Sequence, residues 1–406
     1  MQVSTCQIEL NERIQPPWLP SRSFIAPLVD VDMDAHAIDT AEVMATAHID
    51  GKKYPVVTKG DDGHRINFDI EKTIEVIRTE QYPGAELAIP SAAKLPFDYS
   101  KLPMSVVGMA AKAMYKQIDK SKLPPYPAWP LDHSADILYS IERNDKKAQP
   151  LQWPDEKKYA FALTHDVDTD WVFRNRKWFD AFTSVEEKHG FRSAWYAVPM
   201  SSKSRPARAG LAELVNRGHE VGIHGVTHDP CLADLPHTEL VGKLTTARDM
   251  MSDFCVDQVG YRAPWLSRSE SLYEALRSAG FLYDTTRPTA NFERNNAKSN
   301  NGCGTLFPFR DHDIVELPIT LPQDCIQPCV GKSPEAFWQW VTDVLEMVRS
   351  IGGIAVVTTH IQPHHSANGP MLAGYEKLLQ EVARHNDVFN ALPRDIAAYA
   401  KPLLKM

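Results

Sequence analysis

The stretch "YAFALTHDVDTDW", residues 159–171, joins an apolar run to a cluster of polar groups. Residues 159–163 are continuously apolar, as is typical of a strand that is buried on both faces of a parallel sheet. One imidazole and three carboxylates follow within seven positions, at His165, Asp166, Asp168 and Asp170. Since catalytic groups of α/β folds gather where strands end, this stretch predicts a functional site at the end of its strand.

Six more short apolar runs follow, and amphipathic, helix-like segments lie between most of them. The runs cover residues 193–198, 220–223, 258–261, 281–283, 314–317 and 354–358. Gly190, Gly218 and Gly280 are placed to end helices, and Ser333-Pro334 is placed to begin one. Alternating strands and helices predict parallel strands with helical crossovers, and seven strands favour a distorted barrel over a small open sheet.

The first 150 residues have a different pattern. Residues 41–57 predict two strands around an Asp-Gly-Lys turn, and residues 68–83 predict a helix that Pro83 ends. A proline-rich connector at 121–132 and a second helix at 134–145 follow. We therefore expect a smaller α+β domain over residues 1–150 and a catalytic domain over 151–406. Packing, shaping of the substrate site and oligomerisation all remain open as roles of the first domain, and the oligomeric state is undecided.

The totals exclude several classes of protein. The chain has 406 residues and a net charge of -8, which argues against a nucleic-acid-binding surface. The chain has no run of about 18 apolar residues, so we expect no membrane span. The first residues show no basic start before an apolar core, so we expect a cytoplasmic protein. Six cysteines in so long a chain predict no disulfide framework.

Two histidines after the third strand suggest a metal site. His224 and His228 are four residues apart, which places both imidazoles on one side of a helical turn. One carboxylate would complete a two-histidine, one-carboxylate set with open positions for substrate. Asp166 and Asp168 point the same way in extended backbone, so one of them could bind the metal while the other acts as a base.

Other strand ends carry single polar residues. Arg262 follows the fourth apolar run and could orient a neighbouring carboxylate. Asp284 follows the fifth run and His360 follows the last one. Each residue alone has an ordinary explanation in a turn or on the surface. Their placement after successive strands of one sheet predicts that they share a rim.

This ordered set resembles the polysaccharide deacetylases, the NodB-homology carbohydrate esterases, from Lys158 to about Pro370. "LTHDVDTD" (163–170), "NGCGTLFPF" (301–309) and "ELPITLPQD" (316–324) also resemble a bacterial branch associated with polysaccharide gene clusters. Members of that branch carry an extra N-terminal region. The resemblance implies a distorted (β/α)7 barrel of the NodB-homology type, preceded by the smaller α+β domain.

The resemblance also implies roles for single residues. Asp166 matches the general base and Arg262 the arginine that holds it, while the backbone N–H at Trp265 helps to stabilise the oxyanion. His360 matches the general acid and Asp284 the acid that tunes it. The implied ligands of a divalent metal are Asp168, His224 and His228. Zinc is the expected ion, with cobalt or nickel as alternatives.

The implied reaction removes an acetyl or formyl group from the nitrogen of an amino sugar or glycan precursor. Tyr261, Pro264 and Trp265 are expected to line the substrate site. His165, in place of the aromatic residue of the family, is expected beside the substrate or as a competing ligand. Thr285, Thr286 and Arg287 replace another aromatic position. Arg287, with Arg268, could therefore bind the phosphate of a nucleotide- or lipid-linked sugar.

Two other functions fit the same residues. One is hydrolysis of a small non-sugar amide on the same barrel. The other is a carbohydrate-binding protein that has lost turnover. An inactive descendant is expected to lack a base, an acid or a ligand, whereas this chain has all of them, and we therefore favour an enzyme.

Overall fold

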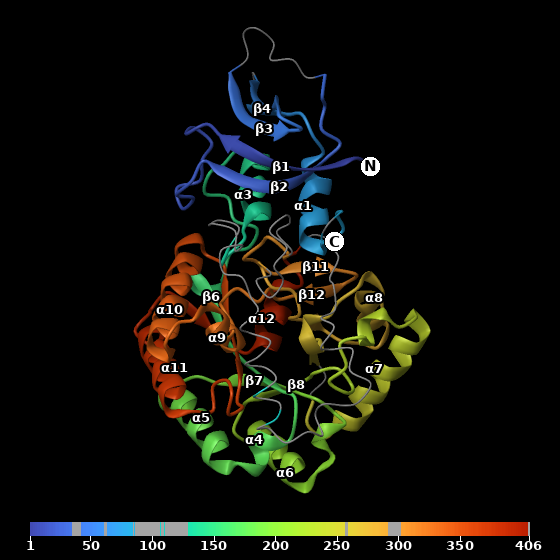
Figure 1. Ribbon diagram of the computed structural model, residues 1–406, viewed down its shortest axis with the longest axis vertical. Helices are drawn as coiled ribbons and strands as arrows, with labels where there is room; N and C mark the ends of the chain where they lie inside the picture. The colour runs from blue at the N-terminus through green and yellow to red at the C-terminus, as the bar shows by residue number, and fades with distance from the viewer. Residues whose placement is uncertain are drawn as a thin grey trace. The chain divides into compact units, whose positions relative to one another are not determined.

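The computed structural model describes residues 1–34, 42–60, 63–83, 85, 106, 109, 129–255, 259–290 and 302–404. The chain forms two compact units (Figure 1). Unit 1 comprises residues 1–86, 121–152 and 288–307, and unit 2 comprises residues 87–120, 153–287 and 308–406. The expected division into 1–150 and 151–406 treats each domain as one continuous stretch, whereas unit 1 also includes the described residues 288–290 and 302–307.

Unit 1 contains a five-stranded antiparallel sheet in the order β2-β1-β3-β4-β5. Its strands are β1 (Val3–Leu10), β2 (Ser23–Val29), β3 (Val43–Ile49), β4 (Lys52–Gly60) and β5 (Gly63–Ile66). Asp50 and Gly51 connect β3 to β4, and both have positive φ, 48° and 76°. Two such residues match the twist of a tight hairpin, so the predicted strand-turn-strand is confirmed.

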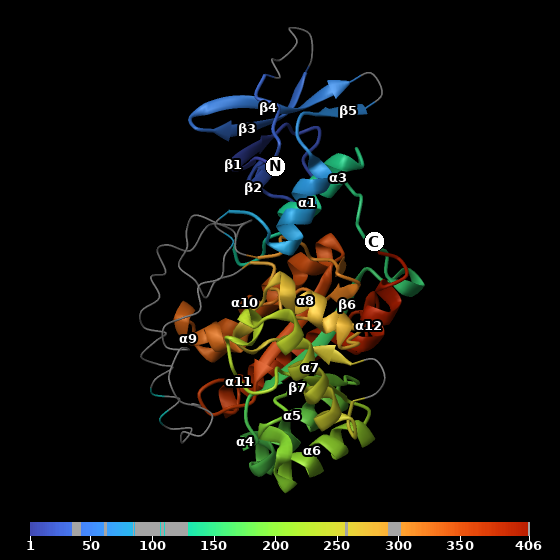
Figure 2. The same ribbon diagram turned by 90° about the vertical axis from the view of Figure 1, so that its right-hand side faces the viewer.

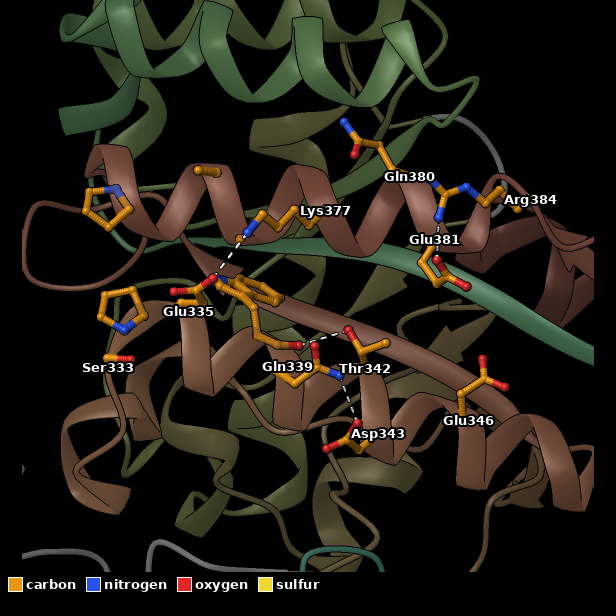
Figure 3. A pocket seen from close by; sticks show the side chains of 15 residues that line it. Ser333, Glu335, Gln339, Thr342, Asp343, Glu346, Lys377, Gln380, Glu381 and Arg384 are labelled. Carbon is orange, nitrogen blue, oxygen red and sulfur yellow. Dashed lines mark hydrogen bonds and ion pairs between the residues drawn. The ribbon is translucent and has the colours of Figure 1, made fainter.

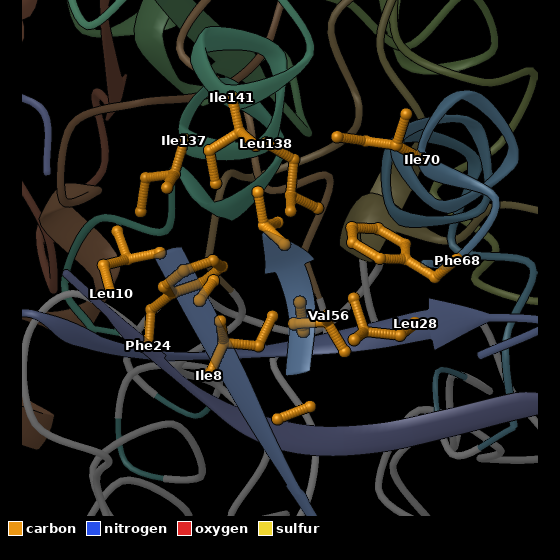
Figure 4. Close-up of a cluster of buried hydrophobic side chains, with 14 of the residues drawn as sticks. Ile8, Leu10, Phe24, Leu28, Val56, Phe68, Ile70, Ile137, Leu138 and Ile141 are labelled. Carbon is orange, nitrogen blue, oxygen red and sulfur yellow. The ribbon is translucent and has the colours of Figure 1, made fainter. Parts of the chain in front are cut away.

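Two helices cover one face of this sheet, α1 (Ile70–Thr79) and α3 (Ser134–Glu142). The Asp69 side chain caps α1 by accepting the Lys72 N–H, and Glu80 ends it in a left-handed conformation. Figure 4 shows how the sheet side chains Ile8 and Phe24 face the helix residues Ile137 and Leu138. Both predicted helices are confirmed. Residues 121–128 of the predicted connector lie outside the described residues.

A distant segment completes unit 1. The carboxylate of Asp136 in α3 accepts hydrogen bonds from the Thr305 hydroxyl at 2.6 Å and the Leu306 N–H at 2.8 Å. Asp136 is buried, and burial raises the pKa of this carboxyl to about 6. A buried carboxyl with two donors fixes the segment around residue 305 to the helix.

Unit 2 is built on one curled sheet, in which seven neighbouring strands run parallel in the order β12-β10-β9-β8-β7-β6-β13. They are β6 (Tyr159–Val167), β7 (Ser193–Ala197), β8 (Glu220–Ile223), β9 (Gly260–Tyr261), β10 (Tyr283–Asp284), β12 (Ile314–Glu316) and β13 (Ile354–His360). Two short strands extend the sheet: β11 (Phe309–Asp311) pairs antiparallel with β12, and β14 (Val388–Asn390) pairs with β6. All seven predicted strands are present. In the described part of the chain no pairing joins β12 to β13, so a closed (β/α)7 barrel is not confirmed.

Helices form an outer layer around these strands (Figures 1 and 2). They are α4 (Trp171–Arg174), α5 (Arg176–Lys188), α6 (Arg205–Asn216), α7 (His237–Met251), α8 (Glu270–Ser278), α9 (Gln327–Val330), α10 (Pro334–Ile351), α11 (Gly369–Val382) and α12 (Pro393–Ala400). Gly190, Gly218 and Gly280 follow α5, α6 and α8 with φ of 75° to 83°, as predicted. The Ser333 hydroxyl accepts the Ala336 N–H and caps α10.

The strand period decides which side chains of β6 face the interior. All nine residues of β6 are buried. Thr164 and Asp166 contact Arg262, which also lies over the ring of Tyr196. His165 points to the opposite side and contacts Glu186 of α5. Successive side chains of a strand alternate between its two faces, so His165 and Asp166 cannot serve the same site.

The outer surface of unit 2 has a groove of about 760 Å³ between α10 and α11 (Figure 3). Lys377 and Glu335 form an ion pair of 3.3 Å across it. None of the strand-end residues predicted for the site lines this groove. Among the described helices of the chain, none is long and apolar enough to cross a membrane.

Candidate active site

The polar residues after the strands gather at one rim of unit 2. Asp166 lies opposite His360 in the parallel pairing of β6 with β13. His224 directly follows β8, and Arg262 directly follows β9. The C-terminal ends of parallel strands lie at the same edge of a sheet, so sequence spacing alone placed these four residues correctly.

Asp168, His224 and His228 present one ligand atom each, and these atoms lie within 4.8 Å of one another. The Oδ1 atom of Asp168 is 3.2 Å from Nε2 of His228 and 3.5 Å from Nε2 of His224. This Oδ1 is buried and accepts no hydrogen bond. A buried carboxylate oxygen without a donor, between two imidazole nitrogens, fits a cation that supplies the missing partner.

The contacts behind these residues hold them in a ligating orientation. Nδ1 of His224 is 2.9 Å from the carbonyl oxygen of Arg262. A carbonyl can only accept, so Nδ1 carries the hydrogen and Nε2 keeps its lone pair for a metal. The Gln362 amide donates to Oδ2 of Asp168 at 2.8 Å. Burial opposes ionisation of Asp168, but His224, His360 and Gln362 outweigh it and lower its pKa to about 2.

Arg262 holds Asp166. The guanidinium donates to Oδ1 of Asp166 at 2.8 Å and to the Thr164 hydroxyl at 2.9 Å. It also donates to the carbonyl and the hydroxyl of Thr285. Arg262 is completely buried, so these partners fix its plane. The expected pairing of Arg262 with Asp166 is present, and it leaves Oδ2 of Asp166 directed to Nε2 of His360 at 3.6 Å.

Asp324 is the acid that contacts His360, and sequence reasoning missed it. Oδ1 of Asp324 is 2.7 Å from Nδ1 of His360, and Oδ2 accepts the His360 backbone N–H at 2.8 Å. The Ser366 hydroxyl donates to the same Oδ2 at 2.6 Å. Burial opposes the charged imidazole, but Asp324, Asp166 and Asp168 together raise the pKa of His360 to about 10.

Asp284, which was expected to tune His360, lies elsewhere. Its carboxylate accepts the Thr286 hydroxyl at 2.6 Å, and Asp284 lies opposite Glu316 in the parallel pairing of β10 with β12. Burial raises the pKa of Asp284 and of Glu316. Asp284 stands at the end of β10, whereas Asp324 follows β12 by a longer segment. The motif "ELPITLPQD" contained the correct residue.

Three residues expected beside the substrate are packed in the core. His165 is fully buried, with Glu186 and Thr359 each 2.7 Å from its ring. Arg287 is buried, pairs with Asp311 at 2.6 Å and lies over the Tyr273 ring, so it has no exposed guanidinium for a phosphate. Tyr261 is fully buried and packs against Phe281. These three substrate contacts are corrected to structural roles.

Pro264 and Trp265 lie in one short turn, and Trp265 is beside His228. Trp265 has φ 58°, a left-handed conformation that is rare for a bulky residue, and its ring centroid is 6.2 Å from that of His228. Pro264 is buried, and a Cβ at Gly225 would approach its Cγ to 2.7 Å. Pro264 therefore shapes the turn, and the substrate contact of Trp265 remains a prediction.

Comparison with known proteins agrees with this geometry. Residues 154–283 match the family model for polysaccharide deacetylase. A peptidoglycan deacetylase from Helicobacter pylori is 25% identical over 240 residues, which cover 52% of this chain and 80% of that protein. The residues that match the family model include Asp166, His224 and Arg262.

Two solved structures share the fold. One is a Mycobacterium smegmatis protein provisionally named polysaccharide deacetylase, with 22% identity and a TM-score of 0.50 over 64% of this chain and 96% of that one. The other is a probable polysaccharide deacetylase from Pseudomonas aeruginosa PAO1, with 14% identity and a TM-score of 0.50 over 63% and 94%. Unit 2 thus has the NodB-type barrel fold that the motifs predicted, and its residues 154–283 match the polysaccharide deacetylase family.

Proposed function

We propose that this protein is a metal-dependent hydrolase that removes an N-acyl group, acetyl or formyl, from an amino sugar of a surface polysaccharide or its precursor. The observation that carries the proposal is the placement of Asp166 and His360 next to the Asp168, His224 and His228 set. Oδ2 of Asp166 and Nε2 of His360 are 3.6 Å apart. A base and an acid beside a cation site are what amide hydrolysis requires.

The cation site fits zinc, with cobalt or nickel as alternatives, because two imidazoles and one carboxylate form an open set for such ions. A divalent cation held there would polarise the acyl carbonyl and lower the pKa of a water molecule. Asp168 is already ionised at neutral pH, since its pKa lies near 2. The ligand set therefore needs no deprotonation of its carboxylate before it binds a cation.

Asp166 acts as the general base. Arg262 occupies Oδ1, so the proton of the attacking water passes to Oδ2. His360 acts as the general acid. Asp324 keeps its imidazole protonated, and Nε2 delivers that proton to the nitrogen of the departing amine. The backbone N–H at Trp265 would donate to the oxyanion of the carbonyl.

Asp166→Asn tests the assignment of the base. We expect the variant to keep its metal and to lose turnover by about 10²- to 10⁴-fold, because the amide cannot accept the proton of the attacking water. Asp170→Asn is the matched control, since Asp170 belongs to the same motif but pairs with Arg174 at 2.7 Å. An unchanged rate in Asp166→Asn would contradict the role of base.

The substrate class needs its own experiment. The purified full chain is loaded with zinc, cobalt or nickel, and release of acetate and formate is measured from N-acetylated and N-formylated amino-sugar oligomers and from small non-sugar amides. Release from the sugars that stops on chelation supports the proposal. Release from the small amides alone would indicate a hydrolase of small non-sugar amides. Metal binding without any release would indicate a carbohydrate-binding protein.

A further inference from the structure

A second group of metal-ligating side chains lies at the general acid. Ligand atoms of Asp324, Cys325 and His360 lie within 4.8 Å of one another. Asp324 and Cys325 are buried, and the side chain of His360 is 14% exposed. The proton transfers described above use Asp324 and His360, but they do not involve the thiol of Cys325.

The donor set identifies the kind of ion that would fit. A carboxylate, a thiolate and an imidazole are ligands of zinc, and the sulfur favours soft ions such as cadmium over magnesium or calcium. Three protein ligands leave a fourth position of a tetrahedral ion open. Oδ2 of Asp324 is held by Ser366 and by the His360 backbone, so Oδ1 can turn to a cation without loss of the local structure.

We propose that Asp324, Cys325 and His360 form a second cation site, for zinc or another thiophilic divalent ion, that switches off the general acid. Binding displaces one proton from the thiol and one from Nδ1 of the imidazolium to solvent, and the ion takes the place of the hydrogen between Nδ1 and Asp324. Nε2 of His360 keeps its hydrogen, but a neutral, metal-bound imidazole gives up that hydrogen far less readily than an imidazolium, so His360 no longer protonates the departing amine. The consequence for turnover rests on the proposed function, whereas binding of the ion does not.

Cadmium binding tests the site without any substrate. The wild-type chain should bind two equivalents, and a thiolate-to-cadmium charge-transfer absorption should accompany one of them. Cys325→Ser and Cys325→Ala should each bind one equivalent and lack the absorption. Cys329→Ser is the matched control, because Cys329 is a buried thiol of the next turn that does not belong to the group, and it should behave as wild type. His228→Ala should lose the other equivalent and keep the absorption.

Zinc inhibition tests the consequence. Each variant is compared with its own rate at one equivalent of zinc. Excess zinc should abolish most of the wild-type and Cys329→Ser rates and leave the Cys325→Ser rate unchanged. A single equivalent in the wild type, or an absorption that persists in both Cys325 variants, would overturn the proposal. Absence of any deacylase activity, with two equivalents still bound, would instead contradict the proposed function and leave the second site intact.

Discussion

Asp166 and Asp168 have the same side chain and lie two residues apart, yet their neighbours give them different chemistry. Arg262 satisfies one oxygen of Asp166 with a charged hydrogen bond. Oδ1 of Asp168 instead faces two imidazole nitrogens and accepts no hydrogen bond. An oxygen that already accepts from arginine is a poor metal ligand, whereas one without a donor is costly unless a cation compensates it. Because both residues are aspartates, their different contacts and not the residue type distinguish Asp166 from Asp168.

Asp324→Asn tests whether Asp324, and not Asp284, raises the pKa of His360. Asp324 raises the pKa of His360, which therefore stays protonated until the pH passes about 10. Removal of the charge lowers that pKa, so the alkaline limb of the pH–rate profile should move to lower pH, with a rate loss of about 10²-fold or more. Asp284→Asn should leave the position of the limb unchanged. A shift in Asp284→Asn and none in Asp324→Asn would restore the sequence-based assignment.

His165→Ala separates a structural role from a ligand role. Loss of the ring leaves the buried carboxylate of Glu186 without one of its partners, which should lower the free energy of unfolding by about 3 kcal/mol. The metal stoichiometry should not change. His228→Ala should give the opposite result, with loss of metal and little change in the stability of the metal-free protein. Chemical denaturation and elemental analysis measure both quantities, and metal loss in His165→Ala would show that this histidine is a ligand.

At the scale of elements, helix packing depends on where glycine lets two helices approach. Gly374 in α11 lies against Trp338 of α10, and a Cβ there would come within 2.2 Å of the indole Cδ1. The indole packs in turn on Tyr375. Since Trp338 is buried, it cannot turn out to solvent. This contact sets the separation of α10 and α11 beneath the groove of Figure 3.

Two alanine substitutions should have opposite effects on stability. Gly374→Ala forces the α10–α11 contact apart and should destabilise by about 1–3 kcal/mol. Gly242→Ala in α7 meets nothing within 4 Å and should stabilise by about 0.5–1 kcal/mol, because alanine loses less conformational freedom in a helix. Thermal unfolding of the two variants beside the wild type measures both. Equal effects would mean that α10 and α11 do not pack as described.

At the scale of the whole unit, a buried carboxyl connects the start of β8 to the last helix. Glu220 accepts the Tyr283 hydroxyl at 2.6 Å and the backbone N–H of Arg394, in the first turn of α12, at 3.1 Å. Tyr283 contacts the Tyr196 hydroxyl, and the Tyr196 ring lies under Arg262. A chain of polar contacts therefore runs through the interior from α12 to the residue that holds Asp166.

Glu220 makes the stability of unit 2 depend on pH. Burial raises the pKa of Glu220 from 4.5 to about 7, so the folded state binds this proton more tightly than the unfolded state. The stabilisation is complete below pH 4.5 and is lost as the pH rises to about 7. Its full size is about 3 kcal/mol, at about 1.4 kcal/mol for each unit of pKa.

Glu220→Gln should remove this part of the pH dependence. Between pH 5 and 7 the wild type should lose more stability than the variant. The comparison uses the slope with pH, since the amide can no longer accept from both donors and its absolute stability also changes. Denaturation at several pH values measures the slopes. Parallel slopes would show that Glu220 ionises as readily in the folded protein as in the unfolded chain.

The sequence predicted the alternation of strands and helices in unit 2 and the hairpin of unit 1. It also predicted that Asp166, His224, Arg262 and His360 lie at strand ends on one rim. Hydrophobic period, glycine and proline positions and the spacing of His224 and His228 are local properties that a linear chain displays. Only the tertiary structure decided that Asp324 contacts His360, that His165, Tyr261 and Arg287 belong to the core, and that residues 302–307 join α3. The physical reason is that each of these depends on the strand face a side chain occupies or on contacts between segments far apart in the chain.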